Sequence, residues 1–365
     1  MSRTDSVGSE RAGAPAGGTG GERAGAPSPY LDSAPLKPGD TVRLIAPSGP
    51  TDEESLQRAI AQLESWGLDV VPGDNVRSRH PRVKYLAGTD AERRSDLVEA
   101  WCDPGTDAVI ALRGGYGAMR LLDGIDFEVM RRHMMRRDGR PKLLTGSSDI
   151  TALHQAWENH LGVASLFCPM VGNDPFKNSA VVPDEVASWL FRPWSGRELG
   201  FPAEKPAEER AANRPLSRAQ TLVPGRAKGR LGGGNLSLIA AGMGSPELID
   251  VRERRERRGP SILMLEDVDE ELYRLDNLMV QLVRGGWFAS ADAVVLGSWE
   301  DCAPVHEVEA LMIDYLGGLG IPIVSEMGFG HDPDAPSVPL GVDVTLDAEP
   351  GERPRLWVDR AGGQT

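Results

Sequence analysis

A tight turn between a predicted strand and a predicted helix could expose a nucleophilic serine. The predicted strand 142–145 leads directly into Gly-Ser-Ser-Asp at 146–149, and apolar residues at helical spacing follow from Ile150. Such a turn presents a side chain while the free N–H groups of the helix N-terminus face a developing oxyanion. The segment departs from the G-x-S-x-G pattern, because Ile150 stands where the second glycine would be. Serine and aspartate at a helix start also commonly cap the helix, so these residues alone leave both interpretations open.

A serine nucleophile requires a general base, and histidine most often serves. His133 lies among arginines, while His154 and His160 lie on or just after the helix that follows the turn, so we interpret all three as packed or exposed helical residues. His331 stands apart, because it follows a glycine-flanked turn after a predicted strand at 321–324, where sites on α/β sheets often form. The complete set is His80, His133, His154, His160, His306 and His331. His331 is therefore the candidate base.

Two acids could orient that base, Glu266 and Asp267. They directly follow an apolar run at 261–265 that predicts a buried strand, so they would project from the end of the strand into a loop. Acids at such a position also cap the next element, and the residues alone do not choose between the two.

A glycine-rich loop at 113–117 follows another predicted buried strand, at 107–112. Its glycines let the backbone approach a ligand closely, and the loop could hold an anion or supply an oxyanion N–H group. It lacks the G-x-G-x-x-G pattern and a P-loop lysine, which argues against a bound nucleotide. The chain also lacks H-E-x-x-H and any Cys/His cluster, and Asp332-Pro333-Asp334 lacks the rest of a calcium loop. We expect neither a cofactor nor a metal.

Alternating strands and helices must position these side chains. A strand predicted at 41–46 precedes a helix whose start carries the capping-box pair Thr51 and Glu54. The same pattern recurs with Thr89 and Glu92 ahead of the next strand. This alternation predicts a Rossmann-like parallel α/β sheet.

Composition divides the chain into four parts. Residues 1–36 contain Glu-Arg-Ala-Gly-Ala-Pro twice and almost no large apolar side chains, so we interpret them as a disordered tail. An N-terminal domain at 37–181 carries the serine, and 182–228, rich in Pro, Arg, Ala and Glu, is interpreted as an interdomain connection. A smaller mixed α/β domain at 229–365 carries the acids and His331. Two domains leave a cleft between them.

The charge and the cysteines restrict partners and compartment. A net charge of -14 and a pI near 5.0 repel phosphate backbones and anionic headgroups, so we expect neither a nucleic-acid nor a membrane partner. Cys102, Cys168 and Cys302 form no CxxC pair, which fits a reducing cytoplasm. The sequence contains no apolar signal segment and no run long enough to span a membrane. We expect a cytoplasmic protein.

Seven motifs in order resemble those of the LD-carboxypeptidases, the serine peptidase family that includes the murein tetrapeptide carboxypeptidase and the microcin C immunity peptidase. The resemblance extends from about Arg43 to Leu346. The motifs are LIAPSG at 44–49, LAGTD at 86–90, RGGYG at 113–117, GSSDITAL at 146–153, GGNL at 233–236, LED at 265–267 and GFGH at 328–331. Seven motifs in one order are highly specific.

The resemblance implies a catalytic triad of Ser148, Glu266 and His331. It also implies an oxyanion hole formed by the backbone N–H groups of Gly115 and Asp149. The residues expected to bind substrate, all within the shared motifs, are Arg113, Gly114, Tyr116 and Asn235. We further expect a homodimer whose substrate is a small peptide ending in a D-amino acid.

The implied reaction is hydrolysis of the amide bond between an L-centre, meso-diaminopimelate or lysine, and the C-terminal D-alanine of muropeptides during cell-wall recycling. The alternative is self-immunity through cleavage of peptidyl or aminoacyl nucleotides of the microcin C type. A non-catalytic anion-binding protein on the same fold is a third possibility. The chain departs from the family at Ser147, where relatives often have an aromatic residue or histidine, and at Cys168, where they have glycine. Both departures could reshape the substrate pocket.

Overall fold

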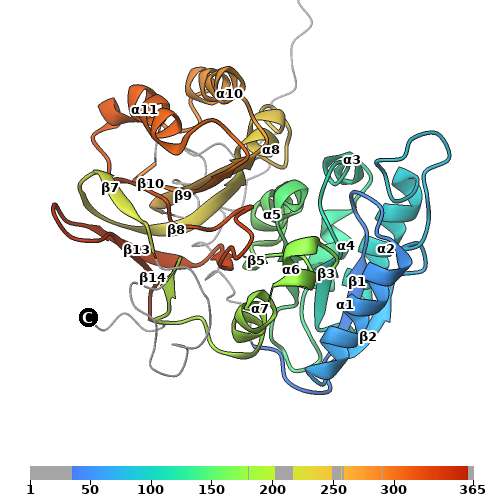
Figure 1. The fold of residues 1–365 in the computed structure, drawn as a ribbon. Helices are drawn as coiled ribbons and strands as arrows, with labels where there is room; N and C mark the ends of the chain where they lie inside the picture. Colours follow the sequence, from blue (N-terminus) through green and yellow to red (C-terminus); the bar gives the residue numbers. More distant parts are fainter. Residues whose placement is uncertain are drawn as a thin grey trace, which may run out of the picture.

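Two β-sheets organise the residues that the computed structural model describes, namely 35–179, 181–201, 217–248, 256, 259–289 and 291–360 (Figure 1). The first sheet has the strand order β12-β5-β4-β3-β1-β2. The strands from β5 to β2 are parallel, and β12 pairs antiparallel with β5. The bounds are β1 Thr41–Ile45, β2 Asp69–Pro72, β3 Ala108–Ala111, β4 Leu143–Gly146, β5 Ser165–Phe167 and β12 Val338–Leu340.

Helices pack on both faces of the first sheet. Alternate residues of β3 enter different cores: Ala108 and Ile110 pack with α1, whereas Val109 and Ala111 pack with α2 and α5. Burial on both faces explains why this strand is a continuous apolar run. The bounds are α1 Glu53–Ser65, α2 Asp90–Cys102, α3 Met119–Leu122, α4 Phe127–Arg132, α5 Thr151–Ala156, α6 Asp174–Asn178 and α7 Val182–Phe191, with a π-helical turn at Trp157–Leu161.

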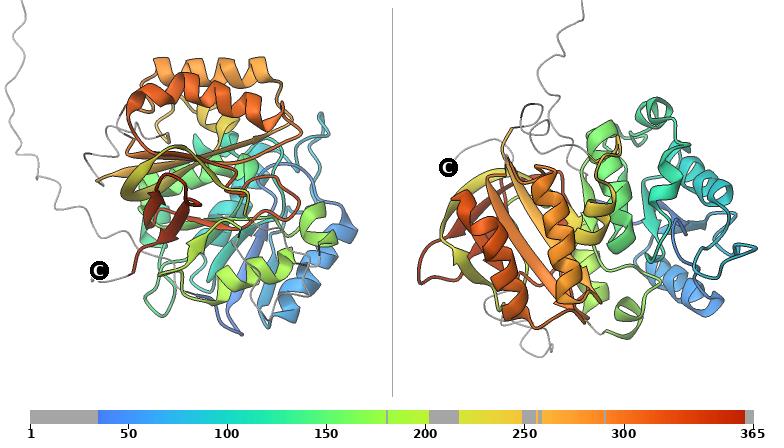
Figure 2. Two further views of the ribbon diagram at one scale, coloured as in Figure 1. Left: turned by 60° about the vertical axis from the view of Figure 1, so that its left-hand side comes forward. Right: turned by 90° about the horizontal axis from the view of Figure 1, so that it is seen from above.

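The second sheet is mixed, with the order β6-β14-β13-β8-β9-β10-β11-β7. Its centre, β8 to β11, is parallel, and the flanking strands are antiparallel. Helices α10 and α11 lie side by side over one face of this sheet (Figure 2). The bounds are β6 Glu198–Leu199, β7 Gln220–Val223, β8 Gly225–Asn235, α8 Leu236–Ala241, β9 Ser261–Val268, α10 Leu272–Arg284, β10 Ala293–Glu300, α11 Val305–Leu316, β11 Ile323–Ser325, β13 Asp343–Ala348 and β14 Arg355–Val358.

The two sheets are joined where α5 meets the end of β8 (Figure 1). Thr151 Oγ1 accepts a hydrogen bond from Asn235 N at 3.0 Å, and Gln155 Nε2 donates to Gly233 O at 3.0 Å. Gly234 has a φ of 137°, and a Cβ there would lie 2.6 Å from Thr151 Oγ1. Glycine therefore permits both the backbone conformation and the close approach of the helix. The helix that follows segment 146–149 rests directly on the second sheet.

The fold class expected from the sequence is confirmed. The segment 182–228 supplies α7, β6, β7 and the start of β8, so the second sheet has more strands than the first. Residues 1–34 and 202–216 lie outside the described residues. Leu36, at the end of the predicted tail, is buried, and its N–H donates to Leu190 O at 2.7 Å.

The two predicted capping boxes differ in outcome. The one at Thr89 is confirmed, since Thr89 Oγ1 accepts from Glu92 N and Glu92 Oε2 accepts from Thr89 N. The one at Thr51 is wrong, because α1 begins one residue later and Asp52 is its N-cap. The Asp52 carboxylate accepts from both Ser55 N and Ser55 Oγ, at 2.8 and 2.7 Å. A carboxylate is a stronger acceptor at a helix N-terminus than a threonine hydroxyl.

Candidate active site

Segment 146–149 forms a sharp elbow between β4 and α5. A 3₁₀ turn at Ser148–Ile150 follows β4 after the single residue Ser147. Ser148 has a φ of 57°, a left-handed conformation that is uncommon for serine and costs backbone strain. Ser147 and Ile150, which hold the N-cap positions of this turn and of α5, make no side-chain capping hydrogen bond. The Asp149 carboxylate accepts from Ser48 Oγ and Ala118 N, which lie outside the helix. The capping interpretation is therefore wrong for Ser147 and Asp149, and the strained Ser148 has the geometry of a nucleophile elbow.

His154, in the first turn of α5, is within hydrogen-bonding distance of the elbow backbone. This buried imidazole lies 2.9 Å from Gly146 O through Nε2 and 2.7 Å from Ser165 Oγ through Nδ1. The carbonyl can only accept, so Nε2 carries the proton and Nδ1 accepts from the serine hydroxyl. Burial lowers the pKa of His154 to about 4, so the ring is neutral at physiological pH. His154 is a packed helical residue, as expected.

The glycine-rich loop 113–117 lies against the elbow. A Cβ on Gly114 would lie 3.1 Å from Ser148 Cβ and 3.3 Å from its Oγ, so the absence of a side chain gives the loop its close approach. Gly114 O accepts from Gly49 N at 3.0 Å, and Gly115 is exposed. The structure thus brings the 114–115 peptide, which contains one of the two expected oxyanion donors, next to the serine.

Glu266 and His331 meet on the second sheet. The strand β9 continues through Glu266 and Asp267 instead of ending before them, which corrects the predicted loop position of both acids. Successive strand residues point to opposite faces, so the two acids have different partners. Glu266 is fully buried, with Oε2 2.6 Å from His331 Nδ1, whereas Asp267 accepts from Asn235 Nδ2 and from Ser237. Glu266 is therefore the acid that pairs with the histidine.

The environment of His331 favours a base at Nε2. Ser298 Oγ accepts from His331 N at 2.9 Å and from Asp332 N at 3.1 Å, which anchors the loop, and the imidazole is 22% exposed. With Nδ1 donating to Glu266, Nε2 is the nitrogen free to accept a proton. Burial lowers the pKa of His331, but the charge and hydrogen bond of Glu266, together with the charges of Asp267 and Glu300, outweigh it and leave the pKa above its ordinary value of 6.5.

The elbow and the Glu266–His331 pair are connected through β8 and β9. Asn235 pairs in register with Glu266, and its N–H bonds Thr151, three residues after Ser148. Within the described residues, no hydrogen bond joins Ser148 to His331, and Glu266 Oε1 is buried without a partner. Catalytic hydrogen bonds are often long before substrate binds, so this arrangement is compatible with a triad that closes on the substrate.

The residues expected to bind substrate occupy different environments. Tyr116 is 52% exposed and makes an edge-to-face contact with Tyr85, with the ring centroids 5.7 Å apart. Arg113 is exposed and donates to Pro50 O at 3.2 Å. Asn235 is buried, and its amide is engaged at both ends, with Asp267 Oδ1 at 2.9 Å and Leu238 N at 3.2 Å. Tyr116 and Arg113 are therefore exposed to solvent, whereas Asn235 is buried and bonds other residues of the second sheet and of α8.

Sequence reasoning missed three residues that hold the site together. Ser48 bonds the Asp149 carboxylate, Thr151 joins the two sheets, and Ser298 anchors His331. Ser48 lies in a loop directly after β1, at the same sheet edge as the elbow, which was an available signal. No sequence signal pointed to Ser298, because it lies within a strand and the residue that it anchors, His331, is 33 positions away in the chain.

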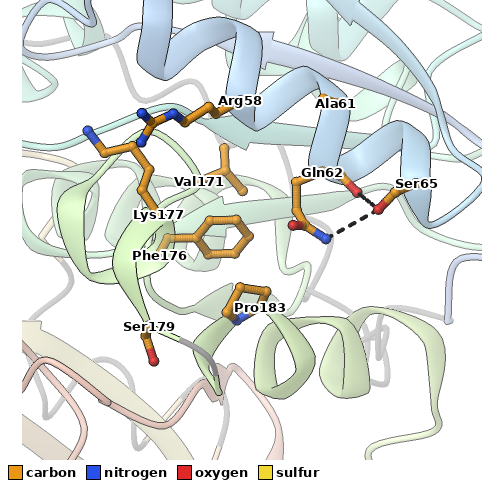
Figure 3. Close-up of a pocket in the computed structure, with 9 residues that line it drawn as sticks. All are labelled: Arg58, Ala61, Gln62, Ser65, Val171, Phe176, Lys177, Ser179 and Pro183. Carbon is orange, nitrogen blue, oxygen red and sulfur yellow. Dashed lines mark hydrogen bonds between the residues drawn. The ribbon is translucent and has the colours of Figure 1, made fainter.

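A separate cavity of about 380 Å³ lies between α1, α6 and α7 (Figure 3). Val171, Phe176 and Pro183 give it an apolar wall, and Lys177 and Arg58 lie at its rim. Both cations are already paired, Lys177 Nζ with Asp174 at 2.7 Å and Arg58 with Glu54. None of the three expected triad residues lines this cavity.

The described residues contain neither a metal-binding cluster nor a membrane-spanning helix. No group of three or more His, Cys, Asp or Glu side chains in this part of the chain could hold a metal ion. No helix there is both long and apolar enough to cross a bilayer.

Two family models match most of the chain. The LD-carboxypeptidase N-terminal domain matches residues 42–168, and the LD-carboxypeptidase C-terminal domain matches residues 228–346. A Streptomyces coelicolor protein provisionally named a carboxypeptidase is 42% identical over 88% of this chain and 96% of its own length. The murein tetrapeptide carboxypeptidase of Pseudomonas aeruginosa is 30% identical over 84% of this chain and 92% of its own.

More distant relatives share the same fold. The crystal structure of the muramoyltetrapeptide carboxypeptidase from Oxalobacter formigenes matches with a TM-score of 0.68 and 28% identity, covering 88% of this chain and 99% of that one. The microcin C7 self-immunity protein of Escherichia coli is 23% identical over 87% of this chain and 93% of its own length. From the two family models and these extended similarities, we conclude that the chain belongs to the LD-carboxypeptidase family.

Proposed function

We propose that this protein is a serine carboxypeptidase that removes the C-terminal D-alanine of muropeptides, cutting the amide bond that follows an L-centre of meso-diaminopimelate or lysine. One observation carries the proposal: the strained Ser148 lies three residues before Thr151, which bonds Asn235 on the second sheet, and Asn235 is in register with the Glu266 that bonds His331. The named murein peptidase among the relatives supports the choice of substrate.

In the proposed mechanism, His331 Nε2 takes the proton from Ser148 Oγ as the oxygen attacks the scissile carbonyl. Glu266 holds the imidazole in the tautomer that leaves Nε2 free, and its charge stabilises the imidazolium that forms. The N–H groups of Gly115 and Asp149 stabilise the tetrahedral oxyanion. His331 then protonates the departing D-alanine, and water hydrolyses the acyl-enzyme by the same steps in reverse order.

The exposed loop residues are proposed to receive the rest of the substrate. Arg113 would pair with the C-terminal carboxylate, because a guanidinium forms charge-assisted hydrogen bonds with carboxylates. Tyr116 and Tyr85 would provide aromatic surface beside it. The three free cysteines, which form no disulfide, are consistent with action in a reducing cytoplasm.

A second candidate function keeps the chemistry and changes the substrate. The similarity to the microcin C7 self-immunity protein supports cleavage of an aminoacyl or peptidyl nucleotide antibiotic. Both reactions pass through an acyl-enzyme on Ser148, so the site residues alone do not separate them. A non-catalytic anion-binding role is disfavoured, because such a role would not require the buried Glu266–His331 pair.

The deciding experiment offers both substrates to the purified protein. A murein tetrapeptide ending in D-alanine, the same peptide ending in L-alanine, and an aminoacyl sulfamoyl adenosine are incubated separately, and products are measured by mass spectrometry. We expect rapid release of D-alanine from the first peptide and little release of L-alanine from the second. Cleavage of the nucleotide conjugate alone would favour the immunity function, and the absence of any cleavage would refute both.

A further inference from the structure

Asp149 directly follows the expected nucleophile, yet its side chain connects loops distant in sequence. The carboxylate is 1% exposed, and its Oδ2 accepts from Ser48 Oγ at 2.5 Å and from Ala118 N at 2.8 Å. Ser48 belongs to the loop after β1, and Ala118 ends the glycine-rich loop after β3. One buried carboxylate therefore connects the elbow to both neighbouring loops.

These two loops also contact each other through the peptide that would supply an oxyanion donor. Gly49 N donates to Gly114 O at 3.0 Å. In a trans peptide the carbonyl of one residue and the N–H of the next point in opposite directions, so fixing Gly114 O also fixes the direction of Gly115 N–H. The position of the Ser48–Gly49 loop thus determines where the Gly115 donor points.

A buried arginine also forms hydrogen bonds with the loop after β1 and with the glycine-rich loop. Arg93 is 2% exposed, and its Nη1 donates to Pro47 O and, at 2.9 Å, to Gly117 O. Burial raises the pKa of Asp149, while the hydrogen bonds from Ser48 and from the backbone and the charge of Arg93 favour its ionised form. A buried carboxylate is costly unless such donors surround it, which argues for a specific task at this position.

We propose that the Asp149 carboxylate is a positioning group for the oxyanion hole, which it holds in shape through Ser48 and Ala118. The carboxylate does not touch the reacting atoms. It keeps the Ser48–Gly49 loop and the 113–118 loop in register with Ser148, so that Gly115 N–H and Asp149 N–H converge on one point. The inference rests on the proposed acyl-transfer function.

The test uses two substitutions of different severity. Asp149→Asn keeps the shape of the side chain but removes its charge and one acceptor oxygen. Ser48→Ala removes a single hydroxyl. The second variant keeps the test possible if the first one folds poorly. Because a lost oxyanion donor or an error of about 1 Å costs about 10²-fold, we expect kcat to fall by about 10²-fold for Asp149→Asn and about 10-fold for Ser48→Ala. KM should change by less than about 2-fold, because the ground-state contacts remain.

Two measurements separate positioning from a loss of folding. In a Ser148→Ala background, Ser48→Ala should leave the Kd of the uncleaved tetrapeptide unchanged. The rate at which a fluorophosphonate labels Ser148 should fall in parallel with kcat, because its phosphoryl oxygen occupies the oxyanion hole. The matched control is Ser55→Ala, which removes a buried hydroxyl bonded to Asp52 at 2.7 Å and should alter thermal stability without altering the labelling rate.

The outcomes distinguish this inference from the proposed function. If the wild type releases no D-alanine but its Ser148 is labelled, the substrate proposal fails while the labelling rates still decide the role of Asp149. Wild-type labelling rates in both Ser48→Ala and Asp149→Asn would overturn the inference. So would a loss of peptide affinity as large as the loss of kcat, since that would place the effect in substrate binding.

Discussion

The elbow and the Glu266–His331 pair hold their functional groups by different means. The elbow depends on backbone geometry, with a left-handed Ser148, a loop that approaches through Gly114, and carbonyls fixed by buried donors. The other region depends on a hydrogen bond between a carboxylate and an imidazole that are 65 positions apart in sequence, with one oxygen of Glu266 unpartnered. Steric and backbone changes should therefore damage the first region, whereas changes of charge and pH should damage the second.

Two histidines, one in each region, illustrate the same difference. His154 contacts only neutral groups, a carbonyl and a hydroxyl, and burial lowers its pKa to about 4. His331 is also partly desolvated, but the neighbouring Glu266 carboxylate raises its pKa above 6.5. The partner of the imidazole, more than its burial, decides whether it titrates near physiological pH. Only the second is suited to act as a general base.

The largest effect is expected at Ser148. Ser148→Ala should reduce kcat by about 10⁴-fold or more, because no other group can form the acyl-enzyme. Ser147→Ala is the matched control: this neighbouring serine makes no capping hydrogen bond, and its loss should cost less than about 10-fold. Release of D-alanine measures both. Equal losses of kcat in the two variants would show that any substitution in the elbow impairs the enzyme, and would contradict the assignment of Ser148 as the nucleophile.

A smaller but pH-dependent loss is expected at Glu266. Glu266→Gln should lower kcat by about 10³-fold, because the imidazole loses the carboxylate that orients it and stabilises its charged form. In the proposed mechanism His331 must be neutral to accept a proton, so the acid limb of kcat/KM in the wild type should lie above pH 6.5. Without the carboxylate its raising effect on the pKa of His331 is lost, and the limb should move to lower pH.

The control for this shift is Glu300→Gln, which removes a carboxylate that also raises the pKa of His331 but less than Glu266 does. The limb should then move slightly in the same direction while kcat stays within about 3-fold of the wild type, since the hydrogen bond to the imidazole remains. A limb that does not move in Glu266→Gln would mean that His331 is not the titrating base.

His154 should make the elbow acid-sensitive in stability rather than in activity. Its folded pKa lies below the unfolded value of 6.5, so the unfolded state binds the proton first. Its contribution to stability is complete above pH 6.5 and is lost as the pH falls to about 4, a loss of about 3 kcal/mol. Urea unfolding between pH 7 and pH 4 should show a smaller decrease for His154→Gln than for the wild type. Equal decreases would place the acid sensitivity elsewhere.

Local patterns could predict much of the fold but not the connections that shape the site. Apolar runs located β3 and β9, and the capping box at Thr89 marked the start of α2. The choice of Glu266 over Asp267 depends on which face of β9 each side chain occupies, and the strand continues past both. The bond between Ser48 and Asp149 joins residues 101 positions apart. Such contacts follow from the packing of loops at one sheet edge, which no local pattern encodes.

The smallest effect tests the junction between the two regions. Thr151 is fully buried, and its Oγ1 accepts from Asn235 N, in register with Glu266. Thr151→Val keeps the shape but leaves this N–H without a partner, so we expect the free energy of unfolding to fall by about 1–2 kcal/mol. Thr151→Ser retains the hydroxyl and should recover most of that loss. If kcat falls in Thr151→Val by more than stability explains, and recovers in Thr151→Ser, then this hydrogen bond sets the distance between the serine and its base. A change in stability alone would mean that each region holds its own geometry and that the junction only keeps them together.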